Sequence, residues 1–356
     1  MDTVENMLKE LTEASGVSGY ENEIKAVMKK YFEPLGSLSY DKLGSLICKK
    51  QGAADSPRVM FAAHMDEVGF MVKYITKEGF IKFTPLGGWW DQVLLAHRVT
   101  IITHTGRVTG IIGAKPPHVL SEEERKKIMT KKEMYIDIGA CSQEEVEKAG
   151  VRVGDPVVPI STFEILAGGK TYLAKAFDDR LGCAMMIEVL KQLKAGHPNT
   201  LYAAATVQEE VGTRGAITGV EMVNPDVAIV AEVDIAGDVP GISPEETPVK
   251  MTKGPVMLAY DARMIPNVKL RDLVIETAKE NAIPLQMSAM EGGATDGGMI
   301  HIHKTGVPTI VISVPTRHIH SHNSIIHRDD FDGAVKLITA VVRRLDAATV
   351  ADLTKW

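Results

Sequence analysis

The sequence has few cysteines, and none of them lies in a pattern that builds a structural site. Its three cysteines, Cys48, Cys141 and Cys183, are far apart and form no CxxC pair. This odd number and wide spacing exclude a disulfide framework and a metal site made of thiolates. A reducing environment fits this pattern best, and we expect a cytoplasmic protein.

The chain also lacks basic blocks and long apolar runs. Its formal net charge is -6, and without a basic block neither a nucleic-acid surface nor a polybasic membrane anchor is expected. No apolar run approaches the roughly 20 residues that a membrane span needs. The acidic, amphipathic N-terminal segment has neither the positive region nor the apolar core of a signal peptide. We therefore expect partners other than nucleic acid or membrane.

The composition is that of a globular protein with more than one core. The 356 residues are 45% hydrophobic and 24% charged, a length and balance that favour two units. Apolar residues recur with helical spacing over 3–15 and 21–32, and a buried strand is predicted at 59–63. Ser18 and Glu21 have the spacing of a capping box that opens the second helix.

Strands and helices alternate in the second half of the chain. Helices are predicted near 179–194, 268–282 and 330–346, and they separate apolar runs at 201–207, 226–231 and 308–314. Residues 68–163 instead contain short β-prone runs with Gly, Pro and Thr. The predicted fold is an α/β sandwich with a mostly parallel sheet, formed by 1–67 and 164–356, with an inserted β-rich, barrel-like domain at 68–163.

Polar residues directly after the apolar runs are the candidate site, because ligands of open α/β sheets bind beyond the carboxyl ends of the strands. Such residues occur at five places: His64 with Asp66, Asp178 with Asp179, Glu209 with Glu210, Glu232, and His320. Oxygen and imidazole ligands without cysteine suit Zn, Co or Mn. These residue types therefore indicate a catalytic divalent-metal site.

Two of the five places have a structural interpretation beside the functional one. His64 could be an ordinary hydrogen-bonded histidine, but a carboxylate at Asp66 can accept its second ring N–H and make it a better metal ligand. Asp178 and Asp179 could cap the helix that follows, since acids favour a helix N-terminus. Capping and metal binding do not exclude each other.

Glu209 and Glu210 are adjacent acids after an apolar strand. Two such carboxylates repel each other unless a cation or a proton separates them. One of them could bind metal while the other accepts a proton from the attacking water. The pair therefore indicates metal-assisted hydrolysis.

Six segments resemble, in order, the motifs of the M42 family of metallo-aminopeptidases, which includes glutamyl and tetrahedral (TET) aminopeptidases. They are HMDEVGF, AFDDRLG, QEEVGTRGA, EVDIAGDVPG, EGGATDGG and PTRHIHS. The resemblance runs nearly end to end, from LTEASGVSGYENEI to the helix after Asp330. It implies an aminopeptidase that hydrolyses the N-terminal residue from short peptides with two divalent ions, zinc or cobalt first and manganese as a possibility.

The resemblance also implies which residues bind the two ions. Matching the motifs position by position gives five ligands: His64, Asp178, Glu210, Glu232 and His320. His64 and Glu232 are expected on one ion, Glu210 and His320 on the other, and Asp178 is expected to bridge them. The remaining acids have other expected roles, with Glu209 as general base, Asp66 as the partner of His64, and Asp179 as a turn residue.

The sequence departs from the family pattern at two ligand positions. The family commonly has aspartate where this chain has Glu232, and Asp234 follows two residues later as a rival ligand. The residues after Ser321 also differ, which makes His322 a weaker rival of His320.

The resemblance implies that residues 68–163 form the dimerisation domain and that dimers assemble into a tetrahedral dodecamer. A di-metal deacylase or amidohydrolase on the same scaffold is the alternative function, because it would use the same ligands. A glycan hydrolase would need two carboxylates and no metal. A non-catalytic metal-binding protein would have no need of a general base such as Glu209.

Overall fold

The computed structural model describes residues 1–355, and its largest element is an eight-stranded sheet of order β1-β2-β12-β3-β13-β16-β14-β15. Its strands are β1 (Ser37–Tyr40), β2 (Leu46–Lys50), β3 (Arg58–His64), β12 (Thr200–Thr206), β13 (Val227–Ile235), β14 (Val256–Tyr260), β15 (Gln286–Ala289) and β16 (Thr309–Thr316). The central strands β12, β3, β13 and β16 are parallel to one another. The carboxyl ends of these four strands therefore meet at one edge of the sheet.

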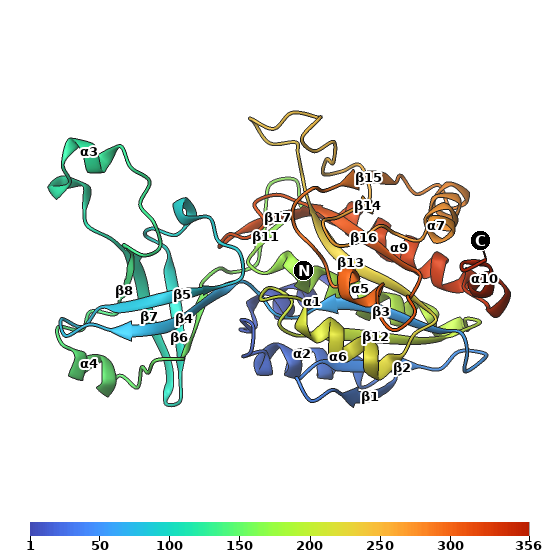
Figure 1. The fold of residues 1–356 in the computed structure, drawn as a ribbon, viewed down its shortest axis with the longest axis horizontal. Coiled ribbons are helices and arrows are strands. Elements are labelled where there is room, and N and C mark those ends of the chain that lie inside the picture. Colours follow the sequence, from blue (N-terminus) through green and yellow to red (C-terminus); the bar gives the residue numbers. More distant parts are fainter. Residues whose placement is uncertain (356) are drawn as a thin grey trace.

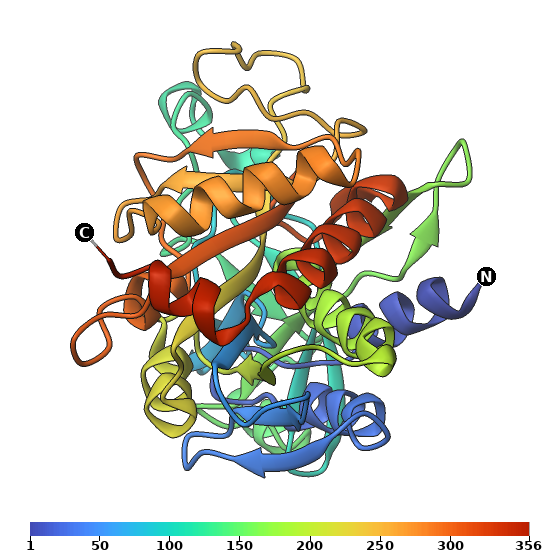
Figure 2. The same ribbon diagram turned by 90° about the vertical axis from the view of Figure 1, so that its right-hand side faces the viewer.

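Helices cover both faces of this sheet. The helices of the α/β unit are α1 (Thr3–Glu13), α2 (Asn22–Phe32), α5 (Phe177–Gln192), α6 (Arg214–Val223), α7 (Val268–Glu280), α8 (Gly297–Ile300), α9 (Arg328–Arg344) and α10 (Ala347–Asp352). Side chains along β3 point alternately to the two faces of the sheet, so two apolar clusters form. Phe61 packs in the cluster that contains α5 and α9, while Met60 and Ala62 pack with α6. Figure 2 shows α7, α9 and α5 lying over one face.

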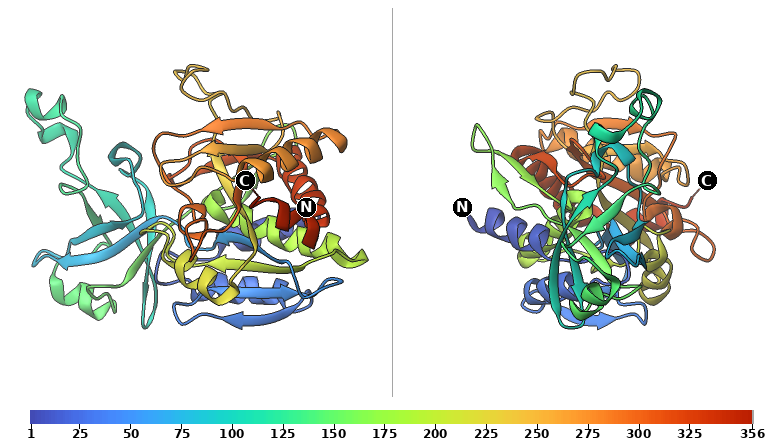
Figure 3. Two further views of the ribbon diagram at one scale, coloured as in Figure 1. Left: turned by 45° about the vertical axis from the view of Figure 1, so that its right-hand side comes forward. Right: turned by 90° about the vertical axis from the view of Figure 1, so that its left-hand side faces the viewer.

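A closed barrel lies beside the α/β unit (Figures 1 and 3). Its strands are β4 (Gly69–Ile75), β5 (Ile81–Leu86), β6 (Arg98–Thr103), β7 (Gly106–Gly113), β8 (Tyr135–Asp137) and β9 (Pro156–Pro159), and its connections carry α3 (Glu122–Arg125) and α4 (Gln143–Lys148). The barrel has a hydrophobic core of its own that includes Phe70, Trp89 and Ile136. The predicted fold class is confirmed: a largely parallel α/β sheet with a β-rich insertion.

A small third sheet lies where the chain leaves the barrel. It consists of β10 (Glu164–Ile165), β11 (Thr171–Ala174) and β17 (Ser324–His327). β11 pairs antiparallel with both neighbours. It leads directly into α5, so this sheet fixes where that helix begins.

A buried ion network joins the end of β3 to the start of α5. The Glu67 carboxylate accepts two hydrogen bonds of 2.7 Å from Lys175 Nζ and one of 3.1 Å from the Gly16 N–H. Arg180 lies 3.4 Å away, and all three charged side chains are buried. Because buried charges must be paired, this network holds β3, the α1–α2 connection and α5 together beneath the site.

The capping box predicted from Ser18 and Glu21 is wrong. Glu21 is the N-cap residue of α2, but its side chain makes no capping hydrogen bond. Ser18 Oγ instead donates to Asp66 Oδ2 at 2.6 Å. Both side chains are buried. Ser18 bonds to Asp66 beyond β3, and Glu21 accepts from the Gly19 N–H and from the Gln208 N–H beyond β12.

Two further sequence features can be placed in the fold. All three cysteines are free, with Cys48 and Cys183 buried and Cys141 exposed. Among residues 1–355, no helix has the length and apolar character needed to cross a membrane.

Candidate metal centre

The predicted site residues gather at the carboxyl edge of the sheet. His64 ends β3, Glu232 lies near the end of β13, and the other residues lie on loops or at the start of α5. They line a cleft of about 910 Å³, and the predicted residues in its wall are His64, Asp178, Glu209, Glu210, Glu232 and His320. The structure thus brings together residues that are up to about 250 positions apart in the sequence.

Asp178 lies between the two histidines. Its Oδ1 is 3.0 Å from His64 Nε2, and its Oδ2 is 3.2 Å from His320 Nε2. On one side, Glu232 Oε1 lies 3.8 Å from His64 Nε2. On the other side, Glu210 Oε2 lies 3.5 Å from His320 Nε2. Each oxygen of Asp178 therefore faces one histidine–carboxylate pair.

Two groups of donor atoms are close enough to surround a cation. The ligand atoms of His64, Asp178 and Glu210 lie within 4.8 Å of one another, and so do those of His64, Asp179 and Glu232. Such clusters of imidazole and carboxylate suit zinc, cobalt or manganese. The donor set therefore fits divalent metal.

Asp179 belongs to one of these groups, but its carboxylate already has backbone partners. Its Oδ2 accepts from the His64 N–H at 3.3 Å, and its Oδ1 accepts from the Gly182 N–H at 2.9 Å. The backbone at Asp178 and Asp179 is not helical. These contacts support the expectation that Asp179 shapes the start of α5.

The carboxylates of the site are strongly perturbed by one another. Burial raises the pKa of Glu209 to about 9 and that of Glu210 to about 8. Burial, Asp179 and Asp178 together raise the pKa of Glu232 well above its usual range. A nearby cation would oppose these shifts, because opposite charge favours the ionised form of a carboxyl group.

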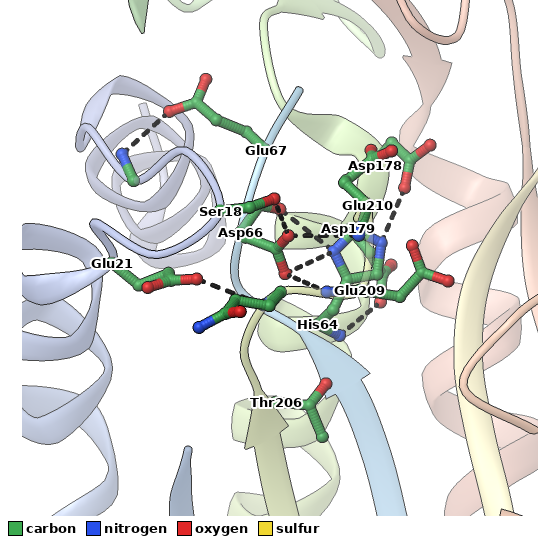
Figure 4. A network of polar contacts seen from close by, with 12 residues as sticks. Ser18, Glu21, His64, Asp66, Glu67, Asp178, Asp179, Thr206, Glu209 and Glu210 are labelled. Atoms are coloured by element: carbon green, nitrogen blue, oxygen red, sulfur yellow. Dashed lines mark hydrogen bonds and ion pairs between the residues drawn. The ribbon is translucent and has the colours of Figure 1, made fainter. Parts of the chain in front are cut away.

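Asp66 holds the turn that carries the two glutamates (Figure 4). Its Oδ1 accepts from the Glu209 N–H at 2.9 Å, and its Oδ2 accepts from the Glu210 N–H at 3.2 Å and from Ser18 Oγ at 2.6 Å. His64 Nδ1 lies 3.0 Å from the Asp66 backbone carbonyl and 3.5 Å from its Oδ1. The nearest partner of His64 Nδ1 is thus the Asp66 carbonyl rather than the predicted Asp66 carboxylate.

Glu21 is a residue of this site that the sequence did not reveal. Its Oε1 accepts from the Gly19 N–H at 2.7 Å and from the Gln208 N–H at 3.2 Å. Gln208 has a left-handed backbone with φ 55°, an unfavourable conformation that the surroundings must hold. Burial and the neighbouring Asp66 raise the pKa of Glu21 to about 7. Glu21 therefore stabilises the residue that precedes Glu209.

The two rival ligands lie in different surroundings. Asp234 is buried and lines the cleft, but neither group of close donor atoms includes it. His322 is also buried and stacks on His97 with ring centroids 3.9 Å apart. Burial lowers the pKa of His322 to about 3. Of the two ligands that the resemblance implies at these positions, Glu232 belongs to one group of close donor atoms. His320 belongs to neither group, but its Nε2 lies 3.2 Å from Asp178 Oδ2.

Comparisons with known proteins show the family of this chain. A family model described as M42 glutamyl aminopeptidase matches residues 44–337, and a second model, AMPT, matches residues 2–28. FrvX from Escherichia coli (strain K12) is 42% identical over 347 residues, which cover 97% of this chain and 96% of FrvX.

Solved structures extend the likeness to the whole fold. A TET aminopeptidase from the marine sediment archaeon Thaumarchaeota archaeon SCGC AB-539-E09 is 50% identical, with a TM-score of 0.97 over 99% of both chains. The Pyrococcus horikoshii TET1 peptidase, described as assembling into a tetrahedron or a large octahedral shell, is 33% identical. Its TM-score is 0.87 over 96% of this chain and 100% of that chain.

The fold and the donor cluster define the class of protein, a hydrolase of the aminopeptidase type. The chain belongs to the M42 family of aminopeptidases. The predicted family is therefore confirmed.

Replacement of Glu21 tests its positioning role. Glu21→Ala removes the acceptor for the Gln208 N–H, and loss of a buried hydrogen bond costs about 1–3 kcal/mol. We expect turnover to fall roughly tenfold, with KM and metal content close to wild type. Glu21→Gln is the matched control, because it keeps an acceptor oxygen and should restore most of the turnover. Wild-type kcat in the alanine variant would contradict this role.

Proposed function

We propose that this M42 protein is a two-metal aminopeptidase that hydrolyses the N-terminal residue from short peptides. The observation that carries the proposal is the position of Asp178, whose two carboxylate oxygens face different histidines at 3.0 and 3.2 Å. A carboxylate in this position can bridge two cations. Two-metal hydrolases hold their ions about 3.5–4 Å apart.

The surrounding donors divide into two sets. His64 and Glu232 would hold one ion, Glu210 and His320 would hold the other, and Asp178 would bridge both. Zinc or cobalt is proposed first, with manganese as a possibility, because the donors are imidazole and carboxylate. When bound, the ions would lower the pKa of a water molecule and polarise the scissile carbonyl.

Glu209 is the proposed general base. It lines the cleft beside the donor cluster, and no role as a ligand is required of it. Nearby cations favour its ionised form, since opposite charge lowers the pKa of a carboxyl group. Glu209 would take a proton from the attacking water and deliver it to the leaving amine. Asp66 would fix its position through the Glu209 N–H.

The domain division is also a proposal. Residues 1–67 and 164–356 would form the catalytic domain, and 68–163 the dimerisation domain. Large apolar side chains on the barrel segment support an interface there: Trp90, Val119, Ile128 and Val153 are all more than half exposed. We expect those of them that lie at the proposed dimer interface to be covered by the partner, as exposed apolar patches mark interaction sites.

We propose that these dimers assemble into a tetrahedral dodecamer, as a shell is described for the TET1 peptidase. The expected native mass is then twelve times the 38.7 kDa of one chain. Sedimentation velocity at micromolar concentration measures it. A monomer over the whole concentration range would contradict both the dimer and the shell.

Metal removal and substrate blocking test the activity. Chelation should abolish release of the first residue from peptides, and Co²⁺ or Zn²⁺ should restore it, because both sets of donors need a cation. Peptides with an acetylated N-terminus should resist cleavage. Cleavage of the acyl group instead would favour the alternative, a di-metal deacylase or amidohydrolase with the same ligands. Activity that survives chelation would contradict the metal mechanism.

Two neighbouring amide substitutions separate base from ligand. Glu209→Gln should keep both ions and lower kcat by roughly 10²-fold or more, because it removes proton transfer. Glu210→Gln should lose one ion, because it removes a ligand. Metal analysis together with single-substrate kinetics distinguishes the two variants. A fully active Glu209→Gln enzyme would exclude Glu209 as the base.

A further inference from the structure

We infer that Asp234 selects substrates whose N-terminal residue has a cationic side chain, lysine or arginine. The inference rests on the proposed aminopeptidase function, because it concerns the same cleft. It names the class of substrate, which the proposed metal chemistry leaves open.

Asp234 occupies a defined place relative to the proposed metal ligands. It follows Glu232 by two residues in β13, so both side chains point to the same face of the strand. Their Cα atoms are separated by roughly 7 Å, the rise of two strand residues. Both residues line the cleft. Asp234 therefore lies about the length of one long side chain from the proposed ligand Glu232.

The carboxylate of Asp234 has an unused acceptor. Asp234 is only 4% exposed, and the Ser288 side chain and the Ile235 backbone lie near its carboxyl group. Its Oδ2 is buried without a hydrogen-bond partner among residues 1–355. A buried carboxylate oxygen without a donor is costly. By contrast, the Asp238 carboxylate on the same segment accepts from Arg317 at 2.8 and 2.6 Å. A donor supplied by the substrate would satisfy the acceptor that remains at Asp234.

The wall around Asp234 suits an aliphatic stem that ends in a charge. Ala236, Val239, Ile242 and Met290 line the same cleft. Lysine and arginine bury their methylene groups along apolar surface and place the charged head at a polar group. A leucine side chain would pack against these apolar residues but leave the Asp234 carboxylate unpaired. A glutamate side chain would be repelled by the charge of Asp234.

One group of opposite sign, Arg263, also lines the cleft. Arg263 is exposed, whereas Asp234 is buried. Solvent and salt screen an exposed charge much more than a buried one. Inside the cleft, the charge of Asp234 therefore acts on an enclosed substrate side chain more strongly than the charge of Arg263 does. We expect the enzyme to prefer cationic over acidic N-terminal residues.

Lysine and norleucine p-nitroanilides give the direct test, because the two side chains differ only in the terminal amine. The wild-type metal-loaded enzyme should prefer lysine by roughly tenfold or more in kcat/KM, and Asp234→Asn should remove most of that ratio. Glu245→Gln is the matched control. It removes an exposed negative charge from the loop that carries Val239 and Ile242, and it should leave the ratio unchanged.

Two results would overturn the inference: no lysine preference in the wild type, or an unchanged ratio in Asp234→Asn. An unchanged ratio can arise because kcat/KM is retained for both substrates or because it is lost equally for both. An equal loss would assign Asp234 to the α-amine rather than to the side chain.

Binding of free lysine and norleucine, measured by calorimetry on the metal-loaded protein, does not depend on turnover. Lysine binding that requires Asp234, without release of any N-terminal residue, would support the inference and contradict the proposed function. Efficient cleavage of neutral N-terminal residues without lysine preference would support the proposed function and contradict the inference.

Discussion

The crowding of carboxylates at one buried edge of the sheet is the constraint on which the rest of the structure depends. The acids concerned are Asp178, Asp179, Glu209, Glu210 and Glu232, each buried or half-buried. Like charges in a poorly solvated site are unfavourable unless protons or cations balance them. The raised pKa values of the glutamates express this cost. A pair of divalent cations would relieve it and would supply the chemistry of hydrolysis.

The fold supplies the means to hold such a cluster in place. Parallel strands bring their carboxyl ends to one edge, and the network of Glu67, Lys175 and Arg180 locks the segments beneath it. Asp66 then ties the Glu209–Glu210 turn to the end of β3. The barrel contributes little to the cleft wall. Its separate core suits the proposed role in assembly.

Most of the site could be predicted because its residues follow apolar runs in ordered motifs. His64, Asp178 and Glu232 are each recognisable from local sequence, and the rule for α/β sheets brings them together. The inserted β-rich segment can likewise be predicted, because the sequence changes there to short β-prone runs with Gly, Pro and Thr. These features depend on patterns that span a few residues.

The other features of the site depend on contacts between segments that are far apart in the sequence. The spacing of residues within one segment does not reveal such contacts. Ser18 and Glu21 fit a capping box locally, yet Ser18 bonds to Asp66, 48 residues away. Glu21 bonds to Gln208, 187 residues away, as well as to its neighbour Gly19. The choice of His64 Nδ1 between the carbonyl and carboxylate of Asp66 is a matter of half an ångström. The unused acceptor of Asp234 likewise appears only after the chain is folded.

A crystal structure of the Zn²⁺-loaded protein, with anomalous data on both sides of the zinc edge, tests the central claim most directly. The account predicts two anomalous peaks about 3.5–4 Å apart, joined by Asp178. One ion should contact His64 and Glu232, and the other Glu210 and His320. A single ion, or a second ion bound by Asp234 in place of Glu232, would contradict it.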